Sequence, residues 1–161
     1  MSVVITIQGT VIEFPSSGQS PNWAPAVIEF AQAVEQALLS SVGPYDVPPQ
    51  AIDITNAASS TPITALSFPT SVVRSVDIRY SIFRKTDTPS SEEIEAGSMT
   101  LAYDSVSSTW SLERDFTGNT DGKTVTFTVD SVGQVFYTSS NLAGTNYSGK
   151  LSFAAQALLQ S

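Results

Sequence analysis

Alternation of apolar and polar side chains dominates residues 63–161 of this 161-residue chain. In residues 75–82, the even positions are Val, Ile, Tyr and Ile, and the odd positions are Ser, Asp, Arg and Ser. A period of two places successive side chains on opposite faces of a β-strand, so each such segment buries one face only. Clusters of Pro, Gly, Asn and Ser separate six or seven of these segments. The pattern predicts a mainly β chain with an antiparallel β-sandwich, jelly-roll-like or immunoglobulin-like.

The same alternation identifies the side chains that should fill the core of the sandwich. They are Val76, Ile78, Tyr80, Ile82, Met99, Leu101, Tyr103, Trp110, Leu112, Phe116, Val125, Phe127, Val129, Val135, Tyr137, Leu151, Phe153 and Ala155. Arg114 is the odd member, because it falls in phase with Trp110 and Leu112 but carries a charge.

The N-terminal part of the chain has a different pattern, which predicts one strand followed by one α-helix. Residues 3–14 read as a β-type run broken at Gly9, and residues 15–25 read as a loop. The helix should span 26–42 and end at Gly43-Pro44. Its apolar stripe permits two interpretations: the helix packs on a sheet of its own chain, or it packs on the same helix in neighbouring copies.

A Pro-rich segment, residues 42–61, is expected to be a stiff linker. This places the domain boundary near residue 60, with a strand-helix anchoring region at 1–60 and the antiparallel β domain at 61–161. The charge distribution also divides the chain: residues 1–73 hold five acidic residues and no Lys or Arg, and all seven basic residues follow from Arg74 onward.

Composition excludes several classes of function. The chain has no His and no Cys, which removes the usual general base, disulfides and thiolate metal sites, so we expect no enzyme activity, no metal and no cofactor. A net charge of -8 without a basic stripe excludes nucleic-acid binding. No segment is long and apolar enough to span a membrane, and no signal-peptide pattern is present, so we expect neither a membrane partner nor export by the secretory route.

The acidic clusters are better explained structurally than chemically. Glu92, Glu93 and Glu95 follow a Pro-Ser-Ser turn and are expected on a solvated strand edge, where charge blocks edge pairing. Residues 119–122 resemble the middle of a calcium loop, but Thr117 and Thr128 stand where the terminal acids should be, so a hairpin turn is expected there.

Four aromatic side chains are candidates for contacts outside the core. Trp110 alternates in phase with Leu112 and is expected in the core. Trp23 lies among prolines before the helix and is expected to make a contact, either within the chain or with a neighbouring subunit. Phe83 and Phe136 lie opposite the inward sets and could contribute to an interface.

Several stretches resemble small virion structural proteins of tailed bacteriophages, of the head-decoration or fibre type. In the N-terminal part these are residues 7–15, 20–25 and 27–34. In the β region they are residues 73–84, 109–112, 133–142 and 149–153. The resemblance implies a non-enzymatic virion component, commonly trimeric, with an N-terminal anchor and a distal β domain.

Residue chemistry agrees with this implication. Charged residues make up 14% of the chain, against about 25% in ordinary soluble proteins, so close packing of many copies desolvates few charges. We expect a homotrimer that docks on other virion proteins of the capsid, neck or tail. The predicted oligomer or docking interface is Val3, Ile5, Ile7, Val11, Phe14, Trp23, Val27, Phe30, Ala31, Val34 and Leu38.

One alternative belongs to a different class of function. A carbohydrate-binding β-sandwich that recognises a host surface glycan would need exposed aromatic side chains that form a shallow platform. Most aromatic residues of the β region fall in phase with the core, which weakens this alternative.

Overall fold

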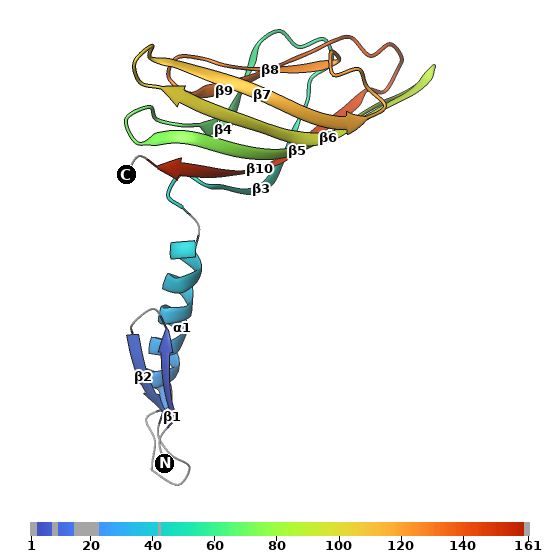
Figure 1. The fold of residues 1–161 in the computed structure, drawn as a ribbon. Coiled ribbons are helices and arrows are strands. Elements are labelled where there is room, and N and C mark those ends of the chain that lie inside the picture. Colours follow the sequence, from blue (N-terminus) through green and yellow to red (C-terminus); the bar gives the residue numbers. More distant parts are fainter. Residues whose placement is uncertain (1–2, 8–9, 15–22, 42, 160–161) are drawn as a thin grey trace. The chain divides into compact units, whose positions relative to one another are not determined.

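The computed structural model describes residues 3–7, 10–14, 23–41 and 43–159 (Figure 1). The chain divides into two compact units, Met1–Pro44 and Tyr45–Ser161, called unit 1 and unit 2 here.

Unit 1 contains a two-stranded antiparallel sheet and one helix. Strands β1 (Val3–Ile7) and β2 (Thr10–Phe14) pair with each other, and helix α1 (Trp23–Ser41) contacts both strands. The expected β-type run over 3–14 is present as two strands, Val3–Ile7 and Thr10–Phe14, that pair with each other. The helix begins three residues earlier than expected, with Pro25 in its first turn, where a missing N–H costs nothing.

Unit 2 is an antiparallel β-sandwich, which confirms the predicted fold class. Its strands are β3 (Val47–Asp53), β4 (Thr61–Ser67), β5 (Val73–Asp87), β6 (Ser90–Asp104), β7 (Thr109–Gly118), β8 (Val125–Val129), β9 (Gln134–Ser139) and β10 (Ser148–Leu159). One sheet has the order β3-β10-β5-β6-β7, and the other has the order β4-β9-β8 (Figure 1).

The expected linker over 42–61 is wrong in part, because residues 47–53 form strand β3. β3 pairs with β10 at the edge of the five-stranded sheet, and Lys150 faces Asp53 across the pair. An edge strand tolerates Pro48 and Pro49, because a residue without an N–H loses no ladder bond on the open side. The boundary between the compact units therefore falls after Pro44, not near residue 60.

The alternation in β5 is reproduced without a break. Every second residue from Val76 to Thr86 is buried, and the residues between them are exposed or partly exposed. The core between the sheets contains most of the predicted side chains, with Ile54, Ile63, Leu66 and Phe68 added from the segments before β5 and Val73 from the start of β5. Tyr103, Leu112 and Val129 are partly buried against this core, whereas Phe116 is 36% exposed.

The two ends of the sandwich differ and are named here. The entry end is where the chain enters unit 2: Asp46 accepts a hydrogen bond from the Ala157 backbone N–H near the end of β10. The start of β5 and the turns 105–108 and 130–133 lie at this end. The far end carries the turn between β5 and β6 and the connections 119–124 and 140–147.

Position 133, in the turn between β8 and β9, requires a glycine for two reasons. Its φ is +87°, and a Cβ there would lie 2.0 Å from the Phe68 backbone oxygen and 3.1 Å from Trp110 Nε1. The Trp110 side-chain nitrogen is buried without a hydrogen-bond partner among the described residues.

We expect Gly133→Ala to lower the free energy of unfolding by at least about 2 kcal/mol, because the left-handed φ and the backbone clash both penalise a Cβ. Urea unfolding measures this change. Ser131→Ala, at an exposed position of the same turn, is the control and should shift stability by less than about 0.5 kcal/mol. Equal effects of the two substitutions would contradict this account of the turn.

Candidate functional site

The predicted interface residues all fall within unit 1, on its three elements. Val3, Ile5 and Ile7 lie in β1, and Val11 and Phe14 lie in β2. The remaining six, Trp23, Val27, Phe30, Ala31, Val34 and Leu38, lie in α1. The side chains of Val3, Ile7, Phe14, Trp23 and Leu38 are outside the described residues, so their predicted contacts stay predictions.

The register of the hairpin divides its side chains between two faces. Ile5 is opposite Ile12 on one face, and Thr6 is opposite Val11 on the other face. Ile12 is fully buried, whereas Val11 is 62% exposed and Val4, on the same face as Val11, is 56% exposed. Ile5, on the same face as Ile12, is 36% exposed, so that face is covered only in part within the chain, and the other face presents apolar side chains to solvent.

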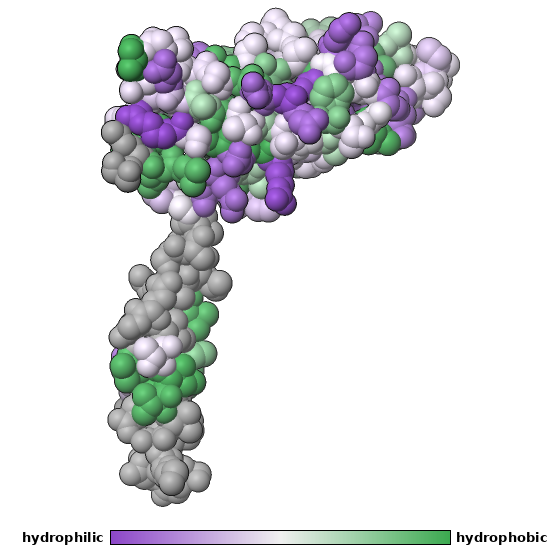
Figure 2. All heavy atoms as spheres, viewed as in Figure 1, coloured by the Kyte–Doolittle hydropathy of each residue, from purple (hydrophilic) through white to green (hydrophobic). Residues whose placement is uncertain are grey.

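Helix α1 is divided in a similar way. Ala26, Phe30, Ala33 and Val34 are partly buried and follow the i, i+4, i+7, i+8 spacing of one helix face. On the neighbouring face, Val27 is 50% exposed and Ile28 is 56% exposed, and Ala31 is also exposed. The helix thus packs one apolar face within its own chain and leaves a second apolar face uncovered. Figure 2 shows apolar residues at the surface of unit 1.

Sequence reasoning missed Val4 and Ile28 as members of this exposed apolar set. Val4 was overlooked because both faces of residues 3–7 are partly apolar, so alternation alone did not say which face is covered. Ile28 lies beside the row Val27, Ala31, Val34 and Leu38 of the predicted interface. Val27 and Ala31 of that row are exposed, so the row is not the most buried line on the helix.

Among the side chains of unit 1 that the structure describes, Ile12 is the one buried apolar side chain, whereas twenty apolar side chains are buried in unit 2. A hairpin and one helix of this size rarely bury enough apolar surface to fold without a further partner. The described part of unit 1 therefore exposes more apolar side chains than it buries.

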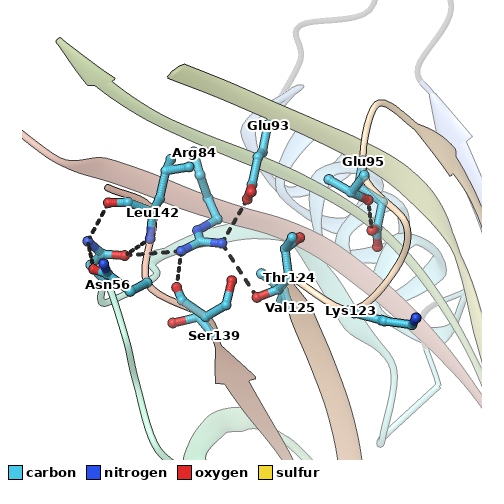
Figure 3. Close-up of polar contacts among 12 residues, drawn as sticks. Asn56, Arg84, Glu93, Glu95, Lys123, Thr124, Val125, Ser139 and Leu142 are labelled. Carbon is cyan, nitrogen blue, oxygen red and sulfur yellow. Dashed lines mark hydrogen bonds and ion pairs between the residues drawn. The ribbon is translucent and has the colours of Figure 1, made fainter. Parts of the chain in front are cut away.

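In unit 2, the most unusual buried group is Arg84, whose side chain is fully buried (Figure 3). It occupies the inward-facing position that follows Ile82 in β5. Its Nη1 donates to Glu93 Oε2 at 2.7 Å and to the Thr124 carbonyl at 3.4 Å. The remaining bonds are from Nε to Tyr147 Oη at 3.1 Å and from Nη2 to Asn56 Oδ1 at 3.1 Å and the Ser140 carbonyl.

A second buried charged group lies nearby on β6. Glu95 is 1% exposed and accepts hydrogen bonds from the hydroxyls of Tyr80, at 2.7 Å, and Thr120. Arg114 lies 3.5 Å from the same carboxylate and donates to the carbonyls of Val125, at 2.7 Å, and Gly122. Burial, and then the bond to Glu95, raises the pKa of Tyr80 far above its usual range.

These two clusters correct two sequence-based expectations. Glu93 and Glu95 do not lie on a solvated strand edge, because both carboxylates point between the sheets, and at Glu95 strand β6 is paired with β5 on one side and with β7 on the other. Residues 119–124 are not a hairpin turn but cross from the five-stranded to the three-stranded sheet. In both clusters the charged groups bind segments of the far end to the strands of the five-stranded sheet.

The aromatic side chains give the glycan alternative little support. Trp110 is 9% exposed, which confirms its predicted place in the core. Phe83 and Phe116 are the exposed large aromatics of unit 2, at 37% and 36%. Phe83 points to the outer face of its sheet, whereas Phe116 shares the inward phase of β7 and lies under the Arg114 guanidinium. The two rings therefore do not share one platform.

Metal-binding and membrane-spanning features are not found among the described residues. Among the described residues, no three acidic, His or Cys side chains are grouped closely enough to hold a metal ion. None of the described helices combines the length and apolarity needed to cross a bilayer.

Comparisons with known proteins were sparse. No family model and no curated protein sequence match the chain. Among solved structures, the chain is similar to the tailspike protein of Acinetobacter phage vB_ApiP_P1, with 13% sequence identity and a TM-score of 0.40. The match covers 68% of this chain and 22% of the tailspike chain.

We expect Arg84→Met to lower the free energy of unfolding by about 3–5 kcal/mol, because Glu93 and two backbone carbonyls would lose their donor in a buried site. The measurement is urea unfolding near neutral pH. Arg79→Met, on the exposed face of the same strand, is the matched control and should change stability by less than about 0.5 kcal/mol. A loss for Arg84→Met no larger than that of the control would contradict the structural role.

The buried Tyr80 hydroxyl makes stability depend on alkaline pH. Because the folded-state pKa is raised above the unfolded value of about 10, the folded chain keeps a proton that the unfolded chain loses. Its contribution is complete below pH 10 and declines as the pH rises above 10. We expect the free energy of unfolding to fall less between pH 8 and pH 11 in Tyr80→Phe than in the wild type, and equal declines would refute this.

Proposed function

We propose that this chain is a non-enzymatic structural protein of a bacteriophage virion, a decoration or fibre-like component. Its copies assemble as a homotrimer through unit 1, which also docks on other virion proteins. Unit 2 is the β domain that the particle presents.

The observation that carries the proposal is the uncovered apolar surface of unit 1. Val4 and Val11 on the hairpin and Val27 and Ile28 on the helix are each at least half exposed, beside one fully buried side chain, Ile12. A second copy that covers these side chains would supply the burial that the unit lacks alone. Glu29 is the one charged side chain described on this surface, so its burial between copies desolvates little charge.

Two further features support the proposal. The resemblance of residues 7–15, 20–25 and 27–34 to phage virion proteins lies in unit 1, the part with the uncovered apolar surface. In unit 2, the buried charged residues Arg84, Glu93 and Glu95 are engaged in structural contacts, as expected of a domain that serves as a scaffold rather than as a catalyst.

The oligomeric state of three chains tests the proposal. The full chain should be a trimer by light scattering coupled to size exclusion. The fragment 45–161, which keeps β3 and the whole core of unit 2, should be a folded monomer. The full chain with Val27→Gln and Ile28→Gln should also be monomeric, because Gln removes the apolar contact while favouring the helix more than Val or Ile does.

Gln32→Ala is the matched control for these helix variants, since Gln32 is an exposed polar residue of the same helix and the change should leave the trimer intact. A full chain that stays monomeric at all concentrations tested would overturn the proposal, and so would a fragment 45–161 with the mass of a trimer.

A further inference from the structure

Two turns of unit 2 repeat the tripeptide Asp-Ser-Val and use it in the same way. In the β6–β7 turn, the Asp104 carboxylate accepts hydrogen bonds from the Val106 backbone N–H at 2.8 Å and from the Ser107 hydroxyl at 2.7 Å. In the β8–β9 turn, the Asp130 carboxylate accepts from the backbone N–H groups of Val132, at 3.0 Å, and Gln134, at 2.9 Å. Each aspartate fixes the backbone of its turn.

Each turn places a valine side chain in solvent. Val106 is 94% exposed and Val132 is 65% exposed. Turn tips are ordinarily filled by small or polar residues, so nothing in the turn itself requires a valine at either position. The apolar side chains are therefore available for a contact outside the turn.

Both turns lie at the entry end of the sandwich, one from each sheet. Gly133 approaches Trp110, the second residue of β7, which ties the β8–β9 turn to the end where β6 passes into β7. Leu158 and Leu159, which pair with the start of β5 at the same end, are 64% and 45% exposed. We call Val106, Val132, Leu158 and Leu159 together the entry-end patch, a name for four exposed apolar side chains of this end rather than for one continuous apolar area.

The covalent connection to unit 1 is short. Helix α1 ends at Ser41, and Tyr45 already packs against the core of unit 2. At 3.8 Å between successive Cα atoms, Tyr45 lies no more than about 15 Å along the chain from Ser41. When copies associate through unit 1, their entry ends are consequently held at high effective concentration.

We propose that the entry-end patch is a second contact surface between copies of this chain, with the patch of one copy against that of its neighbour. The inference rests on the proposed assembly through unit 1, which supplies the proximity. The patch is too small to hold copies together alone, since four side chains cover far less than the area of a stable interface. Tethering makes such a weak contact populated.

Cysteine cross-linking in the full chain tests the contact directly, because the native chain contains no Cys. We would prepare Val106→Cys and Val132→Cys as single variants, with Asp121→Cys at the far end as the control. The Asp121 side chain is 64% exposed, so a cysteine there is comparably accessible. Under mild copper-phenanthroline oxidation, the entry-end cysteines should form disulfide-linked dimers about tenfold faster or more than the control.

A second measurement tests the energetic contribution. The Val106→Ser, Val132→Ser double variant should raise the protein concentration at which the oligomer half-dissociates by about tenfold, because buried apolar contacts between copies are lost. Ser105→Ala with Ser131→Ala changes exposed residues of the same two turns and should leave that concentration unchanged.

The outcomes separate the two proposals. A full chain that is oligomeric, but whose Val106→Cys and Val132→Cys variants cross-link no faster than Asp121→Cys, would overturn the entry-end contact and leave assembly through unit 1 standing. A full chain that is monomeric would overturn both. Fast cross-linking at the entry end together with weaker association of the double Ser variant would support the contact.

Discussion

A guanidinium group that cannot reach water needs an acceptor for each of its five N–H bonds, and in unit 2 this requirement falls on Arg84. Its acceptors come from Asn56, Glu93, Thr124, Ser140 and Tyr147, which lie in four separate segments of the chain. The strands of the smaller sheet end before β5 and β6 do, and loops cover the remaining length. Arg84, with Arg114 and Glu95 beside it, fixes those loops where apolar packing alone would leave their path open.

The sequence predicted the sandwich well because its main signal, a period of two, is the one that burial imposes on strands. The same alternation also predicts that Arg84 points inward, because position 84 continues the buried series 76, 78, 80 and 82. A charged residue in such a series is nevertheless ordinarily assigned to the protein surface. The alternation identifies Arg114 as a charged residue in an inward position, whereas its partner Glu95 is expected from the sequence to lie on a solvated strand edge. Charge type alone does not reveal a partner that lies on another strand.

Two other features were difficult to predict: the strand that contains Pro48 and Pro49, and the covered side of unit 1. Pro48 and Pro49 indicated a linker, although an edge strand accepts them. In unit 1, both faces of the strands and two faces of the helix are apolar. The spacing of apolar residues therefore does not indicate which face is covered. That ambiguity is itself a property of the unit: the chain covers one side, around Ile12, and leaves Val4, Val11, Val27 and Ile28 exposed.

The way the chain enters unit 2 also determines how this unit would bear a mechanical load. Strand β3 starts at the entry end and runs antiparallel to β10 from Val47 to Asp53. A force that pulls on Tyr45 along the strand direction acts on all the β3–β10 hydrogen bonds together, in shear. A force across the strands would instead separate the bonds one after another, beginning beside Val47. Unit 2 is therefore a stronger mechanical element when pulled along its strands than when pulled sideways.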